Sequence, residues 1–437
     1  MNAPRVKVCV VGLWHLGCVY AACLAKLGYS VVGTDENPRT IEGLKRGKAP
    51  LFEPGLDDAI TEAITTGNLS LVDRIEGASQ RADYLVLAYD TPVDSEDQSD
   101  LSVLFRAVSA LKRAGSSATL IVSSQVPVGT CEQIISHLSD REHVPAVAYV
   151  PENLVLGRAI ECFMKPDMIV IGANNHSTIS KVRMLFAPIA TRIVQMDLRS
   201  AEMTKHALNA FLATSISFTN EIGNLCDLVG ADGLKVAEAL KCDSRIGTKA
   251  RLRPGLGFAG GTLARELRAL QSAGERQGYD TVLLNAVLTV NEMQNGSIVD
   301  RLKRLIGGVG QTTVAVFGLT YKAGTSTLRR SAALEIIRRL VSEGARVKAY
   351  DPEVSKAEVP SELFQLCDEP YEAVRDADAL VVMHDWAMLA ELDLKRICSM
   401  MKNPIVLDTQ NVLDPTKVID AGLRYAGIGR GASVLSG

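Results

Sequence analysis

Residues 6–35 read VKVCVVGLWHLGCVYAACLAKLGYSVVGTD, and this stretch decides the fold. The apolar, β-branched run Val6–Val11 predicts a buried strand, and the pattern Val19–Leu27 predicts a helix. A second strand is expected at Ser30–Thr34, and it ends at Asp35. Strand, glycine-containing turn, helix, strand and acid, in this order, are typical of the opening of a dinucleotide-binding βαβ unit.

The turn in this unit, Gly12-Leu13-Trp14-His15-Leu16-Gly17, occupies the G-x-G-x-x-G position with Trp14 in place of the second glycine. That glycine lets the backbone approach a pyrophosphate, so Trp14 either blocks the phosphates or turns its side chain outward. Asp35 is placed to accept hydrogen bonds from both ribose hydroxyls and to repel a 2′-phosphate, which favours NAD over NADP. The alternative is a Rossmann-like domain kept for structure alone.

The rest of the chain alternates between two patterns. Further strand runs separated by helical patterns continue to about residue 199, long helical periodicity fills 200–305, and the strand–helix rhythm restarts at Thr313–Phe317. We therefore predict an α/β protein with two Rossmann-like doubly wound parallel-sheet domains, 1–199 and 306–437, joined by a central helical domain, 200–305. The individual predictions are strands at Tyr84–Ala88, Leu120–Ser123, Met168–Ile171, Arg346–Tyr350, Ala379–Met383 and Ile405–Leu407, and helices at Ala201–Leu228, Thr281–Leu305 and Ala333–Glu343.

Composition narrows the class of protein. The 437 residues are 47% hydrophobic and 22% charged with a net charge of −3, so there is no electrostatic footprint for nucleic acid. We find no apolar run long enough to span a membrane and no signal-peptide pattern, and expect a cytoplasmic protein. Nine cysteines without C-x-x-C spacing indicate reduced thiols, and the six histidines share no metal-ligand spacing, so no metal site is expected.

Several segments, in order, resemble the UDP-glucose/GDP-mannose dehydrogenase family, whose members oxidise a nucleotide-sugar alcohol to the acid with NAD. Each motif alone is modest evidence, but together they cover nearly the whole chain. The matching segments are 43–56 with its Glu-Pro-Gly-Leu, Pro151-Glu152-Asn153-Leu154, 201–210, Asp243-Ser244-Arg245-Ile246-Gly247, 257–270, and Gly318-Leu319-Thr320-Tyr321-Lys322 followed by Arg329.

The resemblance places the active-site loop at 257–270 and shows an exchanged nucleophile. Thr262 stands where the family keeps its catalytic Cys, Arg265 replaces a Lys, and Glu266 replaces an Asp. In the family the Cys adds to the aldehyde formed in the first oxidation, so that a thioester can form and be hydrolysed. A Thr hydroxyl is far less acidic than a thiol and acts as a nucleophile only beside a dedicated base. The alternative is that Thr262 is not a nucleophile and is simply a small polar residue that hydrogen-bonds substrate or water.

The resemblance also implies roles for the residues around this loop. Glu152 matches a carboxylate that handles the hydrolytic water, Lys205 an ammonium that stabilises a developing oxyanion, and Asn209 an amide that binds substrate or water. Lys205 and Asn209 are four residues apart and therefore share one helix face. The alternative to a catalytic role for Lys205 is a solvated charge on the helix surface. The resemblance also implies that Thr91, Arg265 and Arg329 contact the cofactor. It implies that the substrate is bound by Gly257, Phe258, Lys322 and Arg245. For Arg245 a structural ion pair is an equal alternative. Gln125 and Gln410 depart from the family's Thr and Arg.

Three functions remain open at this level. The first is an NAD-dependent, UDP-glucose 6-dehydrogenase-like oxidoreductase that makes a single hydride transfer from a nucleotide sugar, with a UDP-sugar favoured. The second completes both oxidations by adding water directly to the aldehyde, with Glu152 and Glu266 orienting the water. The third is a non-catalytic homologue that only binds a nucleotide sugar. The family resemblance further implies a homodimer built through the long helix that starts near Ala201.

Overall fold

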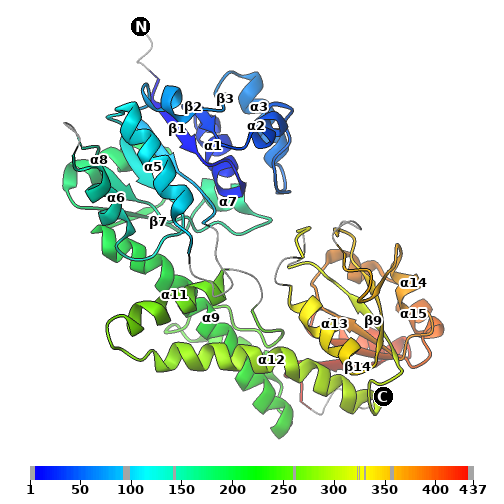
Figure 1. The fold of residues 1–437 in the computed structure, drawn as a ribbon. Helices are drawn as coiled ribbons and strands as arrows, with labels where there is room; N and C mark the ends of the chain where they lie inside the picture. Colours follow the sequence, from blue (N-terminus) through cyan, green and yellow to red (C-terminus); the bar gives the residue numbers. More distant parts are fainter. Residues whose placement is uncertain are drawn as a thin grey trace. The chain divides into compact units, whose positions relative to one another are not determined.

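The computed structural model describes residues 5–91, 99–140, 144–258, 262–321, 323, 325–328, 331–354 and 359–431. The chain divides into two compact units, residues 1–207 and 208–437 (Figure 1). The division into three domains is finer than this and stays a prediction.

The first unit alternates strands and helices along the chain. Its elements are β1 (Lys7–Val11), α1 (His15–Lys26), β2 (Ser30–Thr34), α2 (Pro38–Lys45), α3 (Leu56–Thr65), β3 (Leu69–Val72), α4 (Ile75–Ser79), β4 (Tyr84–Leu87), α5 (Ser102–Ala114), β5 (Thr119–Val122), α6 (Thr130–Leu138), β6 (Val147–Tyr149), α7 (Ala159–Met164), β7 (Met168–Ala173), α8 (His176–Leu185), β8 (Arg192–Met196) and the start of α9 (Leu198–Val229).

These strands form one eight-stranded sheet in the order β3-β2-β1-β4-β5-β6-β7-β8. From β3 to β6 all neighbours are parallel, which confirms the predicted doubly wound sheet. The last two strands run in the opposite direction, since β7 is antiparallel to β6 and parallel to β8. Strands β3, β6 and β8 were not predicted, because β6 has only three residues and β3 and β8 are only partly buried.

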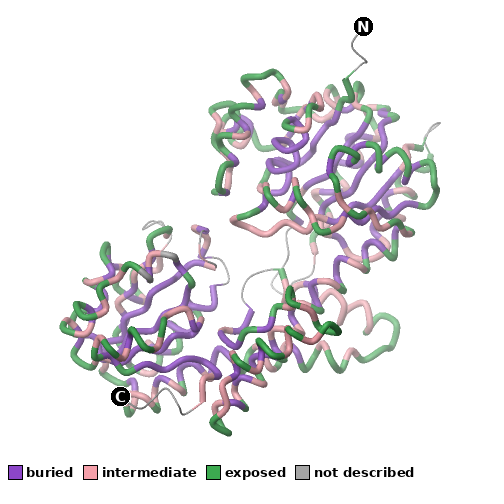
Figure 2. The backbone as a smooth tube through the Cα atoms, turned by 180° about the vertical axis from the view of Figure 1, so that it is seen from behind, coloured by how far each residue is buried: buried purple, intermediate pink, exposed green. Residues whose placement is uncertain are grey.

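The sheet of this unit is covered on both faces, as a parallel sheet requires. Val8 and Val10 of β1 point into one apolar cluster with residues of α1, α3, α7 and α8. Cys9 and Val11, which alternate with them, point into a second cluster with residues of α5 and α6. The central strands of both units accordingly lie in the buried interior (Figure 2).

Helix α1 begins at His15, four residues before the helical pattern suggests, because the last residues of the glycine turn already form its first turn. Gly17 makes this possible, since a Cβ there would lie 1.7 Å from the carbonyl oxygen of Gly12. The boundary predicted at Val19 is therefore wrong at this end.

The second unit joins a helical part to a further strand–helix part. Its elements are the rest of α9, α10 (Gly233–Cys242), α11 (Leu263–Glu275), α12 (Val282–Ile306), β9 (Thr313–Phe317), α13 (Ala332–Ser342), β10 (Arg346–Tyr350), β11 (Gln365–Leu366), α14 (Pro370–Val374), β12 (Ala379–Val382), the 3₁₀-helix η2 (Ala387–Glu391), α15 (Leu394–Met400), β13 (Ile405–Asp408), α16 (Pro415–Asp420) and β14 (Arg424–Gly427).

The second sheet repeats the plan of the first. Its six parallel strands follow the order β11-β10-β9-β12-β13-β14, which matches the order of the first six strands of the chain, β3-β2-β1-β4-β5-β6. The first turns also correspond: Gly12 has φ +88° and Gly318 has φ +102°. Each of these glycines donates its N–H over 3.0 Å to the carbonyl at the end of the neighbouring strand, Thr34 or Tyr350. Two Rossmann-like sheets are therefore present, as predicted.

Candidate active site

The glycine turn after β1 forms a close-fitting cradle at the carboxyl end of the sheet. A Cβ at Gly12 would lie 2.7 Å from the ring of Tyr89, so the positive φ and the close approach both require glycine there. Leu13 and Leu16 are buried in the core beneath the turn. Trp14, at the N-cap of α1, is 47% exposed. The side chain at the altered glycine position therefore lies on the surface and contributes little to the core.

Asp35 at the end of β2 is held in place and still faces an open groove. Its carboxylate accepts hydrogen bonds from the N–H groups of Leu13 at 2.7 Å and Asn37 at 2.8 Å. It also lines a groove of about 520 Å³ together with Glu36, Tyr89 and residues of α4 and α5. An ionised carboxylate at this place fits the two ribose hydroxyls of an adenosine group.

The second sheet carries an acid at the equivalent position, and this acid is buried. Asp351 accepts hydrogen bonds from the N–H groups of Leu319 at 2.7 Å, Thr320 at 3.0 Å and Glu353 at 2.9 Å, and it is only 6% exposed. These bonds stabilise the turn and leave Asp351 buried. Of the two matching acids, Asp35 is the one that lines a groove.

Two polar residues follow the next strands at the same edge of the first sheet. Thr91, after β4, is 7% exposed and donates its hydroxyl to the carbonyl of Gln125 at 2.6 Å. Gln125, after β5, has a buried Nε2 that finds no hydrogen-bond partner in the described parts of the chain. A buried amide donor without a partner is costly, and a bound ligand would relieve that cost.

Glu152, after β6, forms a buried ion pair with Lys205 on α9. The Lys205 Nζ lies 3.1 Å from Glu152 Oε1 and donates at 2.5 Å to the Glu152 carbonyl. The exposed fractions of the two side chains are 5% for Lys205 and 19% for Glu152. Burial opposes the charge on Glu152, but Lys205, the N–H of Leu154 and His15 outweigh it, so the pKa of this carboxyl lies below its usual range. The structure thus contains a carboxylate–ammonium pair rather than a solvated helix charge.

Asn209 and the exchanged loop residues lie in the second unit. Asn209, one turn after Lys205 on α9, is 5% exposed, and its Nδ2 has no partner among the described residues. Thr262 is exposed at the N-cap of α11, and its side chain makes no capping hydrogen bond. Glu266 is 1% exposed with Arg265 3.7 Å away. Both residues belong to α11, and the predicted contact of Arg265 with the cofactor stays a prediction.

The second unit also holds a pocket of about 610 Å³ at the carboxyl ends of β9 and β12. Gly257, Phe258 and Gln410 line this pocket, as do four basic residues and one acid, namely Lys241, Lys249, Arg251, Arg253 and Asp385. Such a surplus of positive charge suits a phosphate-bearing ligand. Sequence reasoning missed Arg251 and Arg253, although the run 241–253 contains five basic residues and a single acid.

Arg245, which sequence reasoning did select, is not among the residues that line this pocket. Its guanidinium forms an ion pair with Asp243 at 2.6 Å, and its side chain is 87% exposed. The structure therefore shows the ion pair that was one of the two interpretations of this residue. Lys322 and Arg329 lie outside the described residues.

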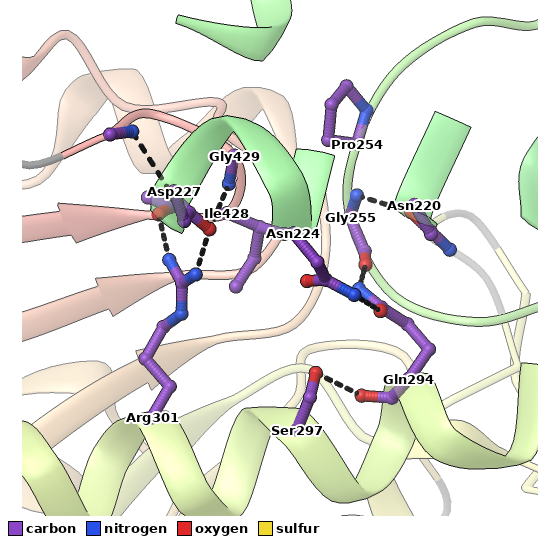
Figure 3. A network of polar contacts seen from close by, with 12 residues as sticks. Asn220, Asn224, Asp227, Pro254, Gly255, Gln294, Ser297, Arg301, Ile428 and Gly429 are labelled. Atoms are coloured by element: carbon purple, nitrogen blue, oxygen red, sulfur yellow. Dashed lines mark hydrogen bonds and ion pairs between the residues drawn. The ribbon is translucent and has the colours of Figure 1, made fainter. Parts of the chain in front are cut away.

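Side-chain amides fix the loop that leads to Gly257 and Phe258. Asn220 accepts from the N–H of Gly255 at 2.9 Å, and Gln294 donates to the carbonyl of Gly255 at 2.6 Å (Figure 3). Asn291 accepts from the N–H of Phe258 at 2.6 Å. The loop has therefore lost much of its freedom before any ligand binds, which favours pre-organised binding.

The same network continues into the end of the chain. Asp227 of α9 pairs with Arg301 of α12 and accepts from the N–H of Gly429 at 2.9 Å (Figure 3). Helices α9 and α12 are thereby joined to the segment after β14. These contacts hold the helical part and the second sheet together within one unit.

The potential metal ligands of the described residues include the cysteines as well as His, Asp and Glu side chains. Within the described residues, no group of three or more His, Cys, Asp or Glu side chains is arranged to hold a metal ion. Cys9, Cys18 and Cys23 are buried, and burial raises the pKa of Cys9 to about 12. No helix in the described part of the chain is long and apolar enough to cross a membrane.

Comparison with known families gives three matches that together span most of the chain. All three carry the description UDP-glucose/GDP-mannose dehydrogenase family: its NAD binding domain matches residues 6–190, its central domain residues 199–293 and its UDP binding domain residues 315–415.

Individual proteins agree with these matches. The chain is 35% identical to UDP-glucose 6-dehydrogenase TuaD of Bacillus subtilis, over 98% of this chain and 94% of that protein. It is 34% identical to a UDP-glucose 6-dehydrogenase of Pseudomonas aeruginosa, over 97% and 98%. The solved structure of a UDP-glucose dehydrogenase from Pyrobaculum islandicum superimposes with a TM-score of 0.89 at 31% identity, covering 98% of both chains.

Proposed function

Since this chain belongs to the UDP-glucose/GDP-mannose dehydrogenase family, we propose that it oxidises a CH–OH group of a nucleotide sugar, with a UDP-sugar as the favoured substrate. The observation that carries the proposal is the pair of Glu152 and Lys205, because a buried ammonium is kept only where a partner offsets its desolvation. The groove beside Asp35 supports NAD as the cofactor, which takes up the hydride when bound.

The residues of the pair suit the first oxidation. Loss of a hydride from carbon requires that the alcohol oxygen lose its proton, and an ionised Glu152 can accept that proton directly or through a water. Lys205 stabilises the negative charge that develops on the same oxygen. The unpartnered amide of Asn209 supplies a further donor to substrate or water.

The second oxidation is where this chain differs from the family pattern. A hydroxyl at Thr262 stays protonated near neutral pH, so it does not form the covalent adduct that a thiolate forms. We therefore propose that the reaction stops after one hydride transfer and releases an aldehyde or ketone. The changes at Thr262, Arg265 and Glu266 each keep the size or the charge of the family residue, which favours a retuned enzyme over a non-catalytic homologue.

We also propose that the chain forms a homodimer through α9. Phe211, Phe218 and Leu225 recur every seven residues on this helix and are 71%, 47% and 52% exposed. An apolar stripe with this period needs a covering partner, and a second copy of the same helix provides one. Light scattering of the purified protein measures its mass in solution and so tests the dimer. A Phe218→Glu variant should shift the measured mass towards that of the monomer.

The test of the activity is a titration with NAD and UDP-glucose that counts the NADH formed per sugar. One NADH per sugar supports the proposal, and two would mean that water completes the oxidation without a thiol. If no NADH forms, calorimetry with each ligand decides the matter: sugar binding without NAD binding favours the non-catalytic homologue, whereas binding of neither ligand points to a different sugar or nucleotide.

A further inference from the structure

Glu53 is a buried carboxylate that joins three separate segments of the first unit. Its side chain is 1% exposed. It accepts hydrogen bonds from the N–H of Gly157 at 2.9 Å and the N–H of Ala159 at 2.8 Å, at the start of α7. Its third partner is the Nε2 of His15, at 2.8 Å. A carboxylate only accepts hydrogen bonds, so with Glu53 in that form the shared hydrogen belongs to His15 Nε2.

His15 is the first residue of α1, directly after Trp14 in the turn where the sequence predicts the pyrophosphate. The side chain of His15 is 13% exposed, so it stands at the edge between the turn and the interior. Through Glu53 it is linked to residues that lie far away along the chain. The link therefore runs from the turn to the loop before α7.

That loop begins at Glu152, the carboxylate of the proposed reaction. Its first end is held by Lys205, through the carbonyl and the carboxylate of Glu152. The loop's other end, Gly157 and Ala159, is held by Glu53. A shift of either anchor would change the position of Glu152.

We propose that His15 is a positioning residue, which couples the pyrophosphate-binding turn to the loop that carries Glu152. Occupation of the turn fixes the start of α1, His15 transmits this to Glu53, and Glu53 holds the 152–158 loop in the arrangement in which Glu152 meets Lys205. The inference rests on the proposed dehydrogenase function for its kinetic consequence, but the mechanical link itself does not depend on turnover.

Hydrogen exchange tests the link without any need for activity. His15→Leu removes the donor to Glu53, His15→Gln restores an N–H at similar reach, and His176→Leu is the matched control, because the exposed His176 also begins a helix, α8. We expect exchange in the peptide covering 153–160 to become about tenfold faster in His15→Leu alone, with β1 and β4 unchanged. Unchanged exchange at 153–160, or faster exchange throughout the unit, would overturn the proposal.

A double-mutant cycle with Glu152→Gln tests the kinetic coupling. If His15 acts through Glu152, His15→Leu lowers kcat about tenfold in the wild-type background, His15→Gln recovers most of it, and His15→Leu has little further effect in Glu152→Gln. Equal factors in both backgrounds would contradict the coupling. Absence of turnover in the wild type would refute the dehydrogenase function, and the exchange experiment would then decide the positioning role by itself.

Discussion

Replacing Lys205 by Met should destabilise the first unit in a manner that depends on pH. The change removes the partner of Glu152 and leaves a carboxylate that is only 19% exposed. Breaking a buried pair in this way costs roughly 3–5 kcal/mol, and the residual exposure of Glu152 places the expected loss at the lower end, about 3 kcal/mol near pH 7.5.

The pH dependence follows from the direction of the pKa shift. In the wild type the pKa of Glu152 is lowered, so its contribution to stability is present above the unfolded pKa of about 4.3 and is lost only as pH falls through the folded pKa. Without Lys205, burial dominates and raises the pKa of Glu152, so the variant loses stability as pH rises above the unfolded pKa. The difference between the two proteins should therefore shrink as pH falls from 7.5 to 5.

Fluorescence can report on the first unit alone. The chain has two tryptophans, Trp14 in the first unit and Trp386 in the second, so a Trp386→Phe background leaves only Trp14 visible. Urea unfolding of Lys205→Met in this background, at pH 7.5 and pH 5, measures the loss. Lys181→Met is the control, because Lys181 is an exposed lysine on α8. A loss below about 1 kcal/mol, or one equal at both pH values, would refute the reasoning.

Four other expectations can be checked separately. Thr262→Cys restores a thiol and should raise the yield from one to two NADH per sugar; a yield that stays at one would show that the thiol alone is not sufficient. Asp35→Ala removes the proposed ribose acceptor and should raise the KM for NAD about tenfold while weakening discrimination against NADP, as steady-state kinetics with both cofactors would show. NAD should quench the fluorescence of Trp14, so the quenching should vanish in Trp14→Phe and persist in Trp386→Phe. Asp227→Asn removes the charged partner of the largely buried Arg301 guanidinium, which keeps its bond to the Gly427 carbonyl, and should cost the second unit about 3 kcal/mol in urea unfolding followed through Trp386; a loss below about 1 kcal/mol would show that the network of Figure 3 contributes little to stability.

The sequence by itself determined the kind and order of the main elements. The run 6–35 contains strand, glycine turn, helix, strand and acid as contiguous patterns, and both sheets and both long helices appear where periodicity predicted them. The hydrogen bonds within an element and the burial of one of its faces depend on residues close together in the chain. Such elements can therefore be recognised from the sequence. The sequence did not predict the short strands or the reversed direction of β7, because these depend on which strands pair with each other.

The motifs also indicated many residues of the candidate site, but only the tertiary structure shows which of these residues contact each other. The sequence placed Glu152 and Lys205 in separate motifs, and the fold brought them together as an ion pair. Likewise, Glu53 meets His15 and Ala159 across 38 and 106 residues. Arg251 matched no family motif, and its place in the pocket follows from where its loop runs. Contacts between residues far apart in the chain depend on how elements pack, and packing is a property of the whole fold rather than of any segment.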